Sequence, residues 1–183
     1  MPGPIFLRGD TVTLRPPERE DLDAIREWLN HPQVWRPALD PLPANEDTAE
    51  SYFERSLTSE TDVKCLVCVD KEPVGVVSLT TTEYGPTATD RARSVELAYH
   101  LSPEYHGRGY GSEAAGRLVQ YAFEDLNMRR VTAHVGAFND ASIGLLESLG
   151  FTHEGTRREA AFYRGYYHDM LTYGLLREEW EDT

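Results

Sequence analysis

In the first third of the chain, hydrophobic and polar residues first alternate, as in a β-strand, and then recur at the spacing of an α-helix. Residues 11–15 alternate, which predicts an opening strand, and apolar residues recur at helical spacing over residues 18–30. Residues 31–47 contain four prolines and predict an irregular loop, of the kind that often borders a binding site. Residues 48–57 predict a second, short helix. The chain is therefore expected to begin with a strand and two helices.

The middle of the chain predicts strands joined by polar connections. Residues 63–69 and 74–81 are rich in β-branched side chains and predict a hairpin, with residues 70–73 as its polar turn. Residues 83–93 are polar, contain a glycine and a proline, and predict a second loop. Residues 94–101 predict a central strand.

A helix and a strand follow, and a second helix comes after them. Apolar residues on one face predict a helix over residues 112–126, and residues 130–135 predict another strand. Asn139 is placed to cap the next helix, and Gly150 is placed to end it in the left-handed conformation.

The order of these elements predicts the fold class. Residues 151–162 and 167–176 predict an antiparallel strand pair at the C-terminus. The strand, helix and strand of residues 94–135 predict a parallel unit, because a crossover helix joins the two strands. The pattern has no internal repeat and predicts a mixed α/β (α+β) fold. With 183 residues the chain fits one domain, residues 1–183.

The charge balance argues against nucleic-acid binding. The formal net charge is -13, and no basic patch stands out, so the chain as a whole repels phosphate backbones. Of the 18 basic residues only Lys64 and Lys71 are lysines. An excess of carboxylates with few lysines suits a high-salt environment, and the alternative is the ordinary variation among acidic proteins.

Neither a membrane span nor a redox motif is expected. No apolar run approaches the roughly 20 residues that cross a bilayer, and no signal peptide is recognisable, so a cytoplasmic location and no membrane partner are expected. Cys65 and Cys68 have Cys-x-x-Cys spacing but lie in a predicted strand, where positions i and i+3 face opposite sides. A structural role is predicted for both, and the scattered histidines predict no metal site.

The most informative segment is His106-Gly-Arg-Gly-Tyr-Gly111, between a predicted strand and a predicted helix. Glycines at alternate positions permit a tight turn that directs successive amides toward one point, beside the positive end of the helix. This geometry suits a pyrophosphate, and a purely structural turn is the alternative. The Walker loop is excluded because no lysine follows the last glycine, and the dinucleotide fingerprint is excluded by the G-x-G-x-G spacing.

At this loop the chain resembles the GNAT superfamily of N-acetyltransferases. Gly109 and Gly111 match the signature Gln/Arg-x-x-Gly-x-Gly/Ala, and His106 stands where glutamine or arginine is usual. Further matching motifs are Asn139-x-x-Ser142, Leu149-Gly150-Phe151, Glu154-Gly155 and Gly165-Tyr166-Tyr167-His168-Asp169. Together they are similar to the ribosomal-protein-alanine N-acetyltransferase branch, the RimJ and RimL type. The resemblance is firm over residues 94–176 and looser upstream.

The resemblance implies a mostly antiparallel sheet with one parallel strand pair that splays apart, flanked by helices. The pantetheine arm of acetyl-CoA would lie in the gap like an added strand, and loop amides would hold its pyrophosphate. Nearby amide donors would stabilise the oxyanion of the reaction. The implied cofactor-binding residues are Tyr99, His100, Leu101, His106, Gly107, Arg108, Gly109, Tyr110, Gly111, Ser112, Asn139 and Ser142.

The resemblance also indicates catalytic candidates. The attacking amine must be neutral, and Glu96 is the first candidate base because family members often carry a carboxylate on this strand; pairing with an arginine is the alternative. His100 shares the face of Glu96 and is the second candidate. The family tyrosine that protonates the CoA thiolate corresponds to Leu146. Ser142 is the substitute that this branch suggests, and a structural hydrogen bond early in the helix is its alternative.

The leading interpretation is acetyl transfer to a protein N-terminal α-amine. Its pKa of about 8, against about 10.4 for lysine, requires only a weak base. A small-molecule amine acceptor (a polyamine, an amino sugar or an antibiotic) is one alternative, and a non-catalytic acyl-CoA sensor, favoured by Leu146, is another. The resemblance suggests a homodimer. Tyr163, Tyr166 and Tyr167 are expected either to line the acceptor pocket or to pack in the core or an interface.

Overall fold

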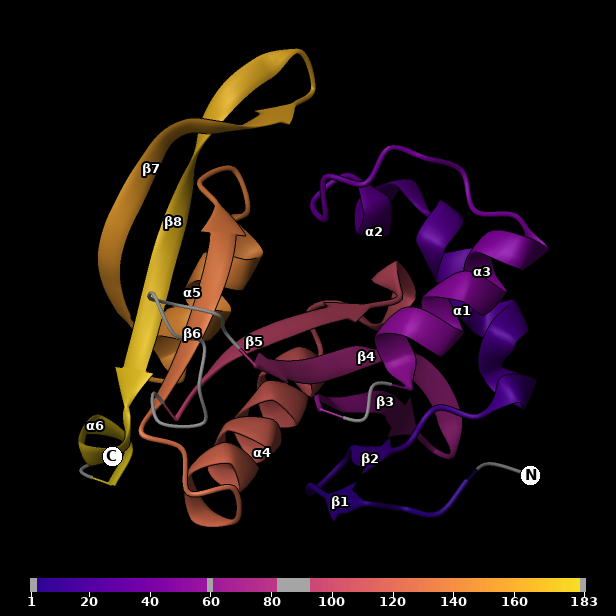
Figure 1. Cartoon of the computed structure of the whole chain (residues 1–183), viewed down its shortest axis with the longest axis horizontal. Coiled ribbons are helices and arrows are strands. Elements are labelled where there is room, and N and C mark those ends of the chain that lie inside the picture. Colours follow the sequence, from indigo (N-terminus) through magenta and orange to yellow (C-terminus); the bar gives the residue numbers. More distant parts are fainter. Residues whose placement is uncertain (1–2, 59–60, 82–92, 182–183) are drawn as a thin grey trace.

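One mixed sheet organises the chain in the computed structural model, which describes residues 3–58, 61–81 and 93–181 (Figure 1). Within these residues the strand order is β1-β2-β3-β4-β5-β6-β8-β7. The strands are β1 Leu7–Arg8, β2 Thr13–Arg15, β3 Val63–Val69, β4 Glu72–Thr81, β5 Ser94–Leu101, β6 Arg130–Gly136, β7 Thr152–Tyr163 and β8 Tyr166–Leu176. The α-helices are α1 Leu22–Asn30, α2 Pro32–Trp35, α3 Glu46–Tyr52, α4 Tyr110–Glu124, α5 Asp140–Ser148 and α6 Arg177–Glu181.

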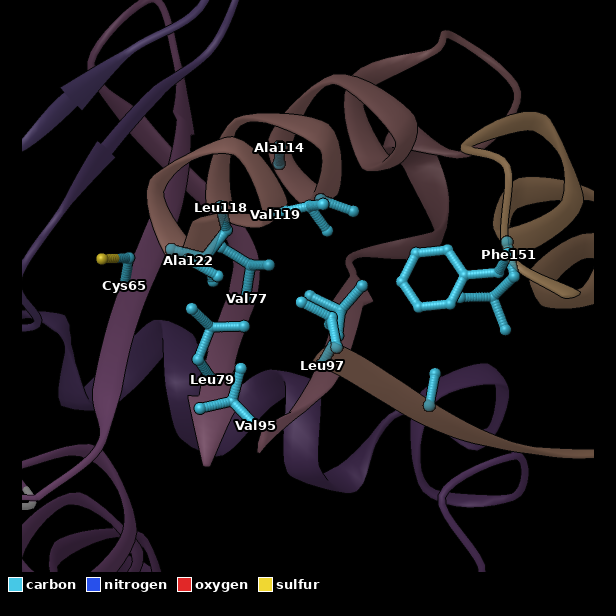
Figure 2. Close-up of a cluster of buried hydrophobic side chains, with 14 of the residues drawn as sticks. Cys65, Val77, Leu79, Val95, Leu97, Ala114, Leu118, Val119, Ala122 and Phe151 are labelled. Carbon is cyan, nitrogen blue, oxygen red and sulfur yellow. The ribbon is translucent and has the colours of Figure 1, made fainter. Parts of the chain in front are cut away.

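Helix α4 covers one face of the sheet and forms the main core. Ala115, Leu118 and Ala122 are fully buried on its inner face, as their spacing predicts. Figure 2 shows this helix packed on Val77 and Leu79 of β4. Burial of such side chains contributes about 1.5 to 3 kcal/mol each. This face therefore supplies most of the hydrophobic stabilisation.

Helices α1 and α3 cover the opposite face and form a smaller core. Trp28 of α1 and Phe53, just after α3, pack there against buried side chains of β3, including Cys68. Cys65 belongs to the main core on the other face, and both thiols are free and buried. The prediction that the two cysteines face opposite sides is confirmed. Burial raises the pKa of both thiols, that of Cys65 to about 12, which keeps them protonated.

The region between the first two predicted helices is more regular than the sequence suggests. Residues 31–47 were expected to form an irregular loop, but they contain α2 and the start of α3. Helix α3 begins at Glu46 rather than at residue 48, because the Asn45 side chain accepts a hydrogen bond from the Thr48 amide at 2.8 Å. The predicted loop at residues 83–93 lies outside the described residues except for Arg93.

Two hairpin turns are tighter than the pattern predicts. The β3–β4 turn consists of Asp70 and Lys71 alone, with φ values of 50° and 74°, so the expected four-residue turn is wrong. Pro73 consequently lies inside β4, opposite Cys68, where the register shifts at a bulge. The final hairpin closes through Arg164 and Gly165.

The parallel pair β5 and β6 is short, although both strands are long. Its register includes Ser94 with Arg130, Val95 with Val131, and Glu96 with Thr132, and then it ends. Strand β5 continues to Leu101 along β4, and β6 continues along β8 (Figure 1). The predicted parallel unit and its splay are both confirmed. Backbone edges beyond Glu96 thereby face a gap in the sheet.

The first two strands are tied to α4 by polar contacts. Glu113 accepts hydrogen bonds from the amides of Thr11, at 2.7 Å, and Val12, at 3.0 Å, and from the Thr11 hydroxyl. Arg117 Nε donates to the carbonyl of Arg8 at 2.8 Å. Burial opposes ionisation of Glu113, but these hydrogen bonds outweigh it and lower the pKa of its carboxyl. Helix α4 is thus anchored at the turn where it begins.

No described helix is both long enough and apolar enough to cross a lipid bilayer.

Candidate active site

A cavity of about 710 Å³ lies where β5 and β6 diverge. Its walls come from β5, from the glycine loop and α4 on one side, and from α2 and the segment after it on the other. Of the predicted cofactor-binding residues, all except Arg108 line it. These residues are far apart in the sequence, and the fold therefore brings them together at one place.

The glycine loop forms the cavity wall at the start of α4. Gly107 and Gly109 have φ values of 72° and 84°, a left-handed backbone that favours glycine. Helix α4 starts at Tyr110, two residues earlier than the apolar pattern predicts, so Gly111 and Ser112 belong to its first turn. The first amides of a helix have no partner within it, and the helix dipole is positive there. This wall suits an anion such as a diphosphate.

The two larger side chains of the loop have different positions. His106 Nε2 lies 3.0 Å from the carbonyl oxygen of Leu101, a contact that closes the loop onto the end of β5. The guanidinium of Arg108 lies over the ring of Tyr105, 5.6 Å from its centroid. The structure thus does not bring Arg108 into the cavity.

Tyr99 links the splayed strand to the first turn of α5. Asn139 caps this helix, since its side-chain oxygen accepts from the Ser142 amide at 3.2 Å. The Tyr99 hydroxyl donates to the Ser142 carbonyl at 3.3 Å. Burial raises the pKa of Tyr99 to about 12, so its phenol keeps its proton at neutral pH. Leu146, at the position of the family tyrosine, is buried in the core.

The cavity also reaches the opposite face of the sheet. Cross-strand pairs place His100 beside Val76, and Ala98 beside Ser78, on the face that α1 and α3 cover. Glu96 has the same parity on β5 and lines the cavity with them. Because Tyr99 and Leu101 point to the α4 face, the cavity passes through the sheet at the splay. A ligand held by the glycine loop and one held under α2 can meet there.

The charges around Glu96 come from its own face. The Lys64 ammonium donates to the Thr80 hydroxyl at 2.7 Å and lies 3.9 Å from Asp62. Burial lowers the pKa of Lys64, whereas the charges of Asp62 and Glu96 raise it. Among the residues that the structure describes, the neighbouring cation of Glu96 is therefore Lys64. Among the described residues Glu96 is the sole carboxylate of the cavity, and neither lysine nor arginine lines it.

His100 has an apolar setting. Its ring meets Trp28 edge-on, with centroids 6.0 Å apart. Burial lowers the pKa of His100 to about 4, which keeps the imidazole neutral at physiological pH and makes it a weak proton acceptor.

Several cavity residues escape sequence reasoning. Val34 and Leu39 come from the segment expected to be an irregular loop, and Leu39 has a φ of 60°, which no side-chain pattern indicates. His134 of β6 also lines the cavity, with Nδ1 3.2 Å from the Thr172 hydroxyl. Its position after the parallel segment of β6 is the one signal that points to it.

The aromatic residues of the last hairpin lie elsewhere. Tyr163 stacks on Phe138 with ring centroids 4.0 Å apart, and Tyr166 and Tyr167 are exposed at the hairpin tip. None of these three tyrosines lines the cavity. Of the two roles expected from the sequence, Tyr163 therefore has the one in packing.

The splayed strands, the glycine loop and the cavity between them define an acetyltransferase of the GNAT class. The family model "Acetyltransferase (GNAT) domain" matches residues 11–152, and the chain belongs to this family. It is an acetyl-CoA-dependent N-acetyltransferase.

Relatives extend along nearly the whole chain. "Putative ribosomal N-acetyltransferase YdaF" of Bacillus subtilis (strain 168) is 27% identical over 180 residues, covering 94% of this chain and 95% of the relative. Spermidine N(1)-acetyltransferase of Vibrio cholerae is 26% identical over 170 residues, covering 92% and 95%. The crystal structure of the Vibrio cholerae spermidine N-acetyltransferase with CoA and spermine superposes with a TM-score of 0.82 at 25% identity, covering 93% of this chain and 98% of that chain.

Proposed function

We propose that this enzyme transfers the acetyl group of acetyl-CoA to the α-amine at the N-terminus of a polypeptide. The observation that carries the proposal is the cavity through the sheet, in which Glu96 is the sole carboxylate among the described lining residues. One carboxylate suits an acceptor with one amine. An α-amine, with a pKa of about 8, is also partly neutral near pH 7.5 and needs little help from a base. The similarity to the relative YdaF supports the same choice.

The donor is held on the α4 side. Acetyl-CoA supplies an activated thioester carbonyl. The amides of Gly107 to Gly111 bind its diphosphate, because they combine unpaired donors with the positive end of α4. The free edge of β5 from Tyr99 to Leu101 pairs with the amides of the pantetheine arm. Asn139 fixes the first turn of α5 beside that arm.

Glu96 accepts the proton of the amine, directly or through a water molecule. It lines the cavity on the acceptor face, within reach of the splay. His100 is the second candidate, and burial lowers its pKa to about 4. Glu96 differs from it in its negative charge, which raises the pKa of Lys64 and would also attract the ammonium form of the acceptor. We therefore assign the base to Glu96 and a positioning role to His100.

The proton for the departing sulfur comes from the point where Tyr99 of β5 meets the first turn of α5. Ser142 lines the cavity there, and its carbonyl holds the Tyr99 hydroxyl at 3.3 Å. We assign Ser142 to orient the sulfur or a water molecule. We assign Tyr99 to supply a protonated hydroxyl, in place of the family tyrosine whose position Leu146 occupies in this chain.

A small-molecule amine acceptor is the second candidate function. The spermidine N-acetyltransferase relatives favour it, and they match this chain almost as well as YdaF does.

Thiol release from acetyl-CoA distinguishes these functions. The enzyme is incubated with peptides that have free or blocked N-termini, with spermidine and with an amino sugar. We expect release with free N-terminal peptides and none with blocked ones. Faster release with spermidine than with any peptide would support the small-molecule function instead. CoA binding by calorimetry without release from any acceptor would indicate a sensor.

A further inference from the structure

The acceptor side of the cavity is mostly apolar. Val34 of α2 and Val76 of β4 are 7% and 4% exposed and line it from two directions. Pro37, Ala38 and Leu39, in the turn after α2, complete the wall. Figure 1 shows α2 beside the gap in which β5 and β6 diverge.

Leu39 has a backbone conformation that side-chain-bearing residues seldom adopt. Its φ is 60°, and the turn is held by hydrogen bonds from the Leu39 amide to the Arg36 carbonyl and from the Asp40 amide to the Trp35 carbonyl, both at 3.1 Å. A bulky residue in this region costs roughly 1 to 3 kcal/mol, and such residues cluster at ligand sites. The strained turn places an apolar side chain at the cavity wall.

The charge distribution limits what this side can bind. A polyamine carries several ammonium groups, and each needs a counter-charge or water when it is buried. Among the described lining residues the cavity offers only Glu96, and His100 beside it stays neutral. The described lining therefore offers a full counter-charge to one ammonium, and the apolar wall of residues 34–39 faces the remainder of the acceptor.

We propose that the acceptor subsite takes a single primary amine flanked by an apolar group, namely a polypeptide whose first residue has an apolar side chain, and that Leu39 contacts this side chain. The inference rests on the proposed function and deepens it. Apolar surroundings also favour the neutral form of a bound amine, which is the nucleophile. The same wall thus selects the acceptor and prepares it for attack.

The test compares acceptors that differ in one side chain. Two peptides identical except for leucine or aspartate at the first position are assayed by thiol release, together with spermidine and 2-phenylethylamine. We expect kcat/KM for the leucine-first peptide to exceed that for the aspartate-first peptide by about tenfold or more. We also expect 2-phenylethylamine to be used better than spermidine.

A matched pair of variants assigns the preference to Leu39. Leu39→Asp adds a carboxylate at the wall, and Leu42→Asp makes the same change in the same segment, where Leu42 is 74% exposed and outside the cavity lining. Leu39→Asp should lower kcat/KM for the leucine-first peptide about tenfold and raise it for spermidine. Leu42→Asp should change neither. Thermal unfolding and the KM for acetyl-CoA of both variants should match those of the unmodified enzyme.

Failure of this inference and failure of the proposed function are distinguishable. Equal acetylation of both peptides would overturn the apolar subsite and leave the α-amine function intact. Acetylation of 2-phenylethylamine, with none of either peptide, would support the apolar subsite and overturn the polypeptide acceptor. Preference for spermidine, or an unchanged preference in Leu39→Asp, would overturn the subsite.

Discussion

The donor side and the acceptor side of the cavity are assembled from the chain in different ways. The donor side follows directly from β5: the strand ends, the glycine loop turns, and α4 begins within a few residues. The acceptor side combines α2, α3, β4 and β5, which are far apart in the sequence. The glycine-loop part of the proposed donor side is therefore encoded locally, whereas Asn139 and Ser142 at the start of α5 and the whole acceptor side come together through tertiary packing. Substitutions on the two sides should affect different kinetic quantities.

The largest effect is expected for Glu96→Gln on the acceptor side. Without the base, kcat should fall about 100-fold or more. The affinity for CoA should not change, because Glu96 lies on the other face from the glycine loop. Stopped-assay kinetics and calorimetry measure the two quantities. Glu72→Gln, an exposed carboxylate outside the cavity lining, is the control. A loss of CoA binding in Glu96→Gln would contradict the separation of the two sides.

Gly109→Val should produce the reverse result. Gly109 has a φ of 84° and lines the cavity, so a β-branched side chain strains the loop and projects toward the diphosphate. We expect the Kd for CoA to rise about 10- to 100-fold, equivalent to the roughly 1 to 3 kcal/mol of such strain. Gly155→Ala, at an open position in β7, is the matched change. Unaltered CoA affinity in Gly109→Val would remove the glycine loop from the donor site.

Tyr99→Phe tests the connection between the two sides. Loss of the hydroxyl removes its hydrogen bond to Ser142, and we expect kcat to fall about tenfold while CoA affinity stays nearly constant. Since the pKa of Tyr99 is about 12, its phenol should produce no titration in the rate profile at neutral pH. Tyr121→Phe, on α4 and outside the cavity lining, serves for comparison. Full activity in Tyr99→Phe would leave Ser142 as the remaining proton donor.

The smallest effect concerns stability and His100. Its folded pKa of about 4 lies below the unfolded value of about 6.5, so the unfolded chain binds more protons between these values. The free energy of unfolding should thus decrease as pH falls from 6.5 to 4. In His100→Asn this decrease should be smaller by about 1 kcal/mol. The expected difference is modest because the His100 ring is only partly buried. Urea unfolding at several pH values measures it. His153→Gln, at an exposed position, is the comparison variant.

Most strands and the cavity wall at the glycine loop were predictable because their signals are local. Strand-forming residues located β3 and β5, and the apolar pattern located the start of α4 to within two residues. Helix α2 was missed although Pro32 occupies its first turn, because the four prolines suggested a loop. Strand β1 and helix α6 were missed because two and five residues are too few to show a period.

The acceptor wall could not be predicted in the same way. Nothing in the side chain of Leu39 indicates its positive φ, which depends on the turn around it. The neighbourhood of Glu96 was also hidden, because Lys64 reaches it across β4 through the register of three strands. Local patterns show which residues a strand exposes on each face, and only the packed sheet decides which of them share a cavity.

The contacts of Glu113 and Arg117 have a practical consequence for handling the protein. They join the backbone of Arg8, Thr11 and Val12 to the opening turns of α4, so shortening the chain past Thr11 removes a support of the coenzyme loop from a distance. The hydrogen bonds to Glu113 lower the pKa of its carboxyl, so it stays ionised until the pH falls below the usual range for a glutamate. Only stronger acid therefore releases this part of the support. N-terminal deletions should therefore stop before Arg8, and the Glu113 contacts should persist in mildly acidic solution.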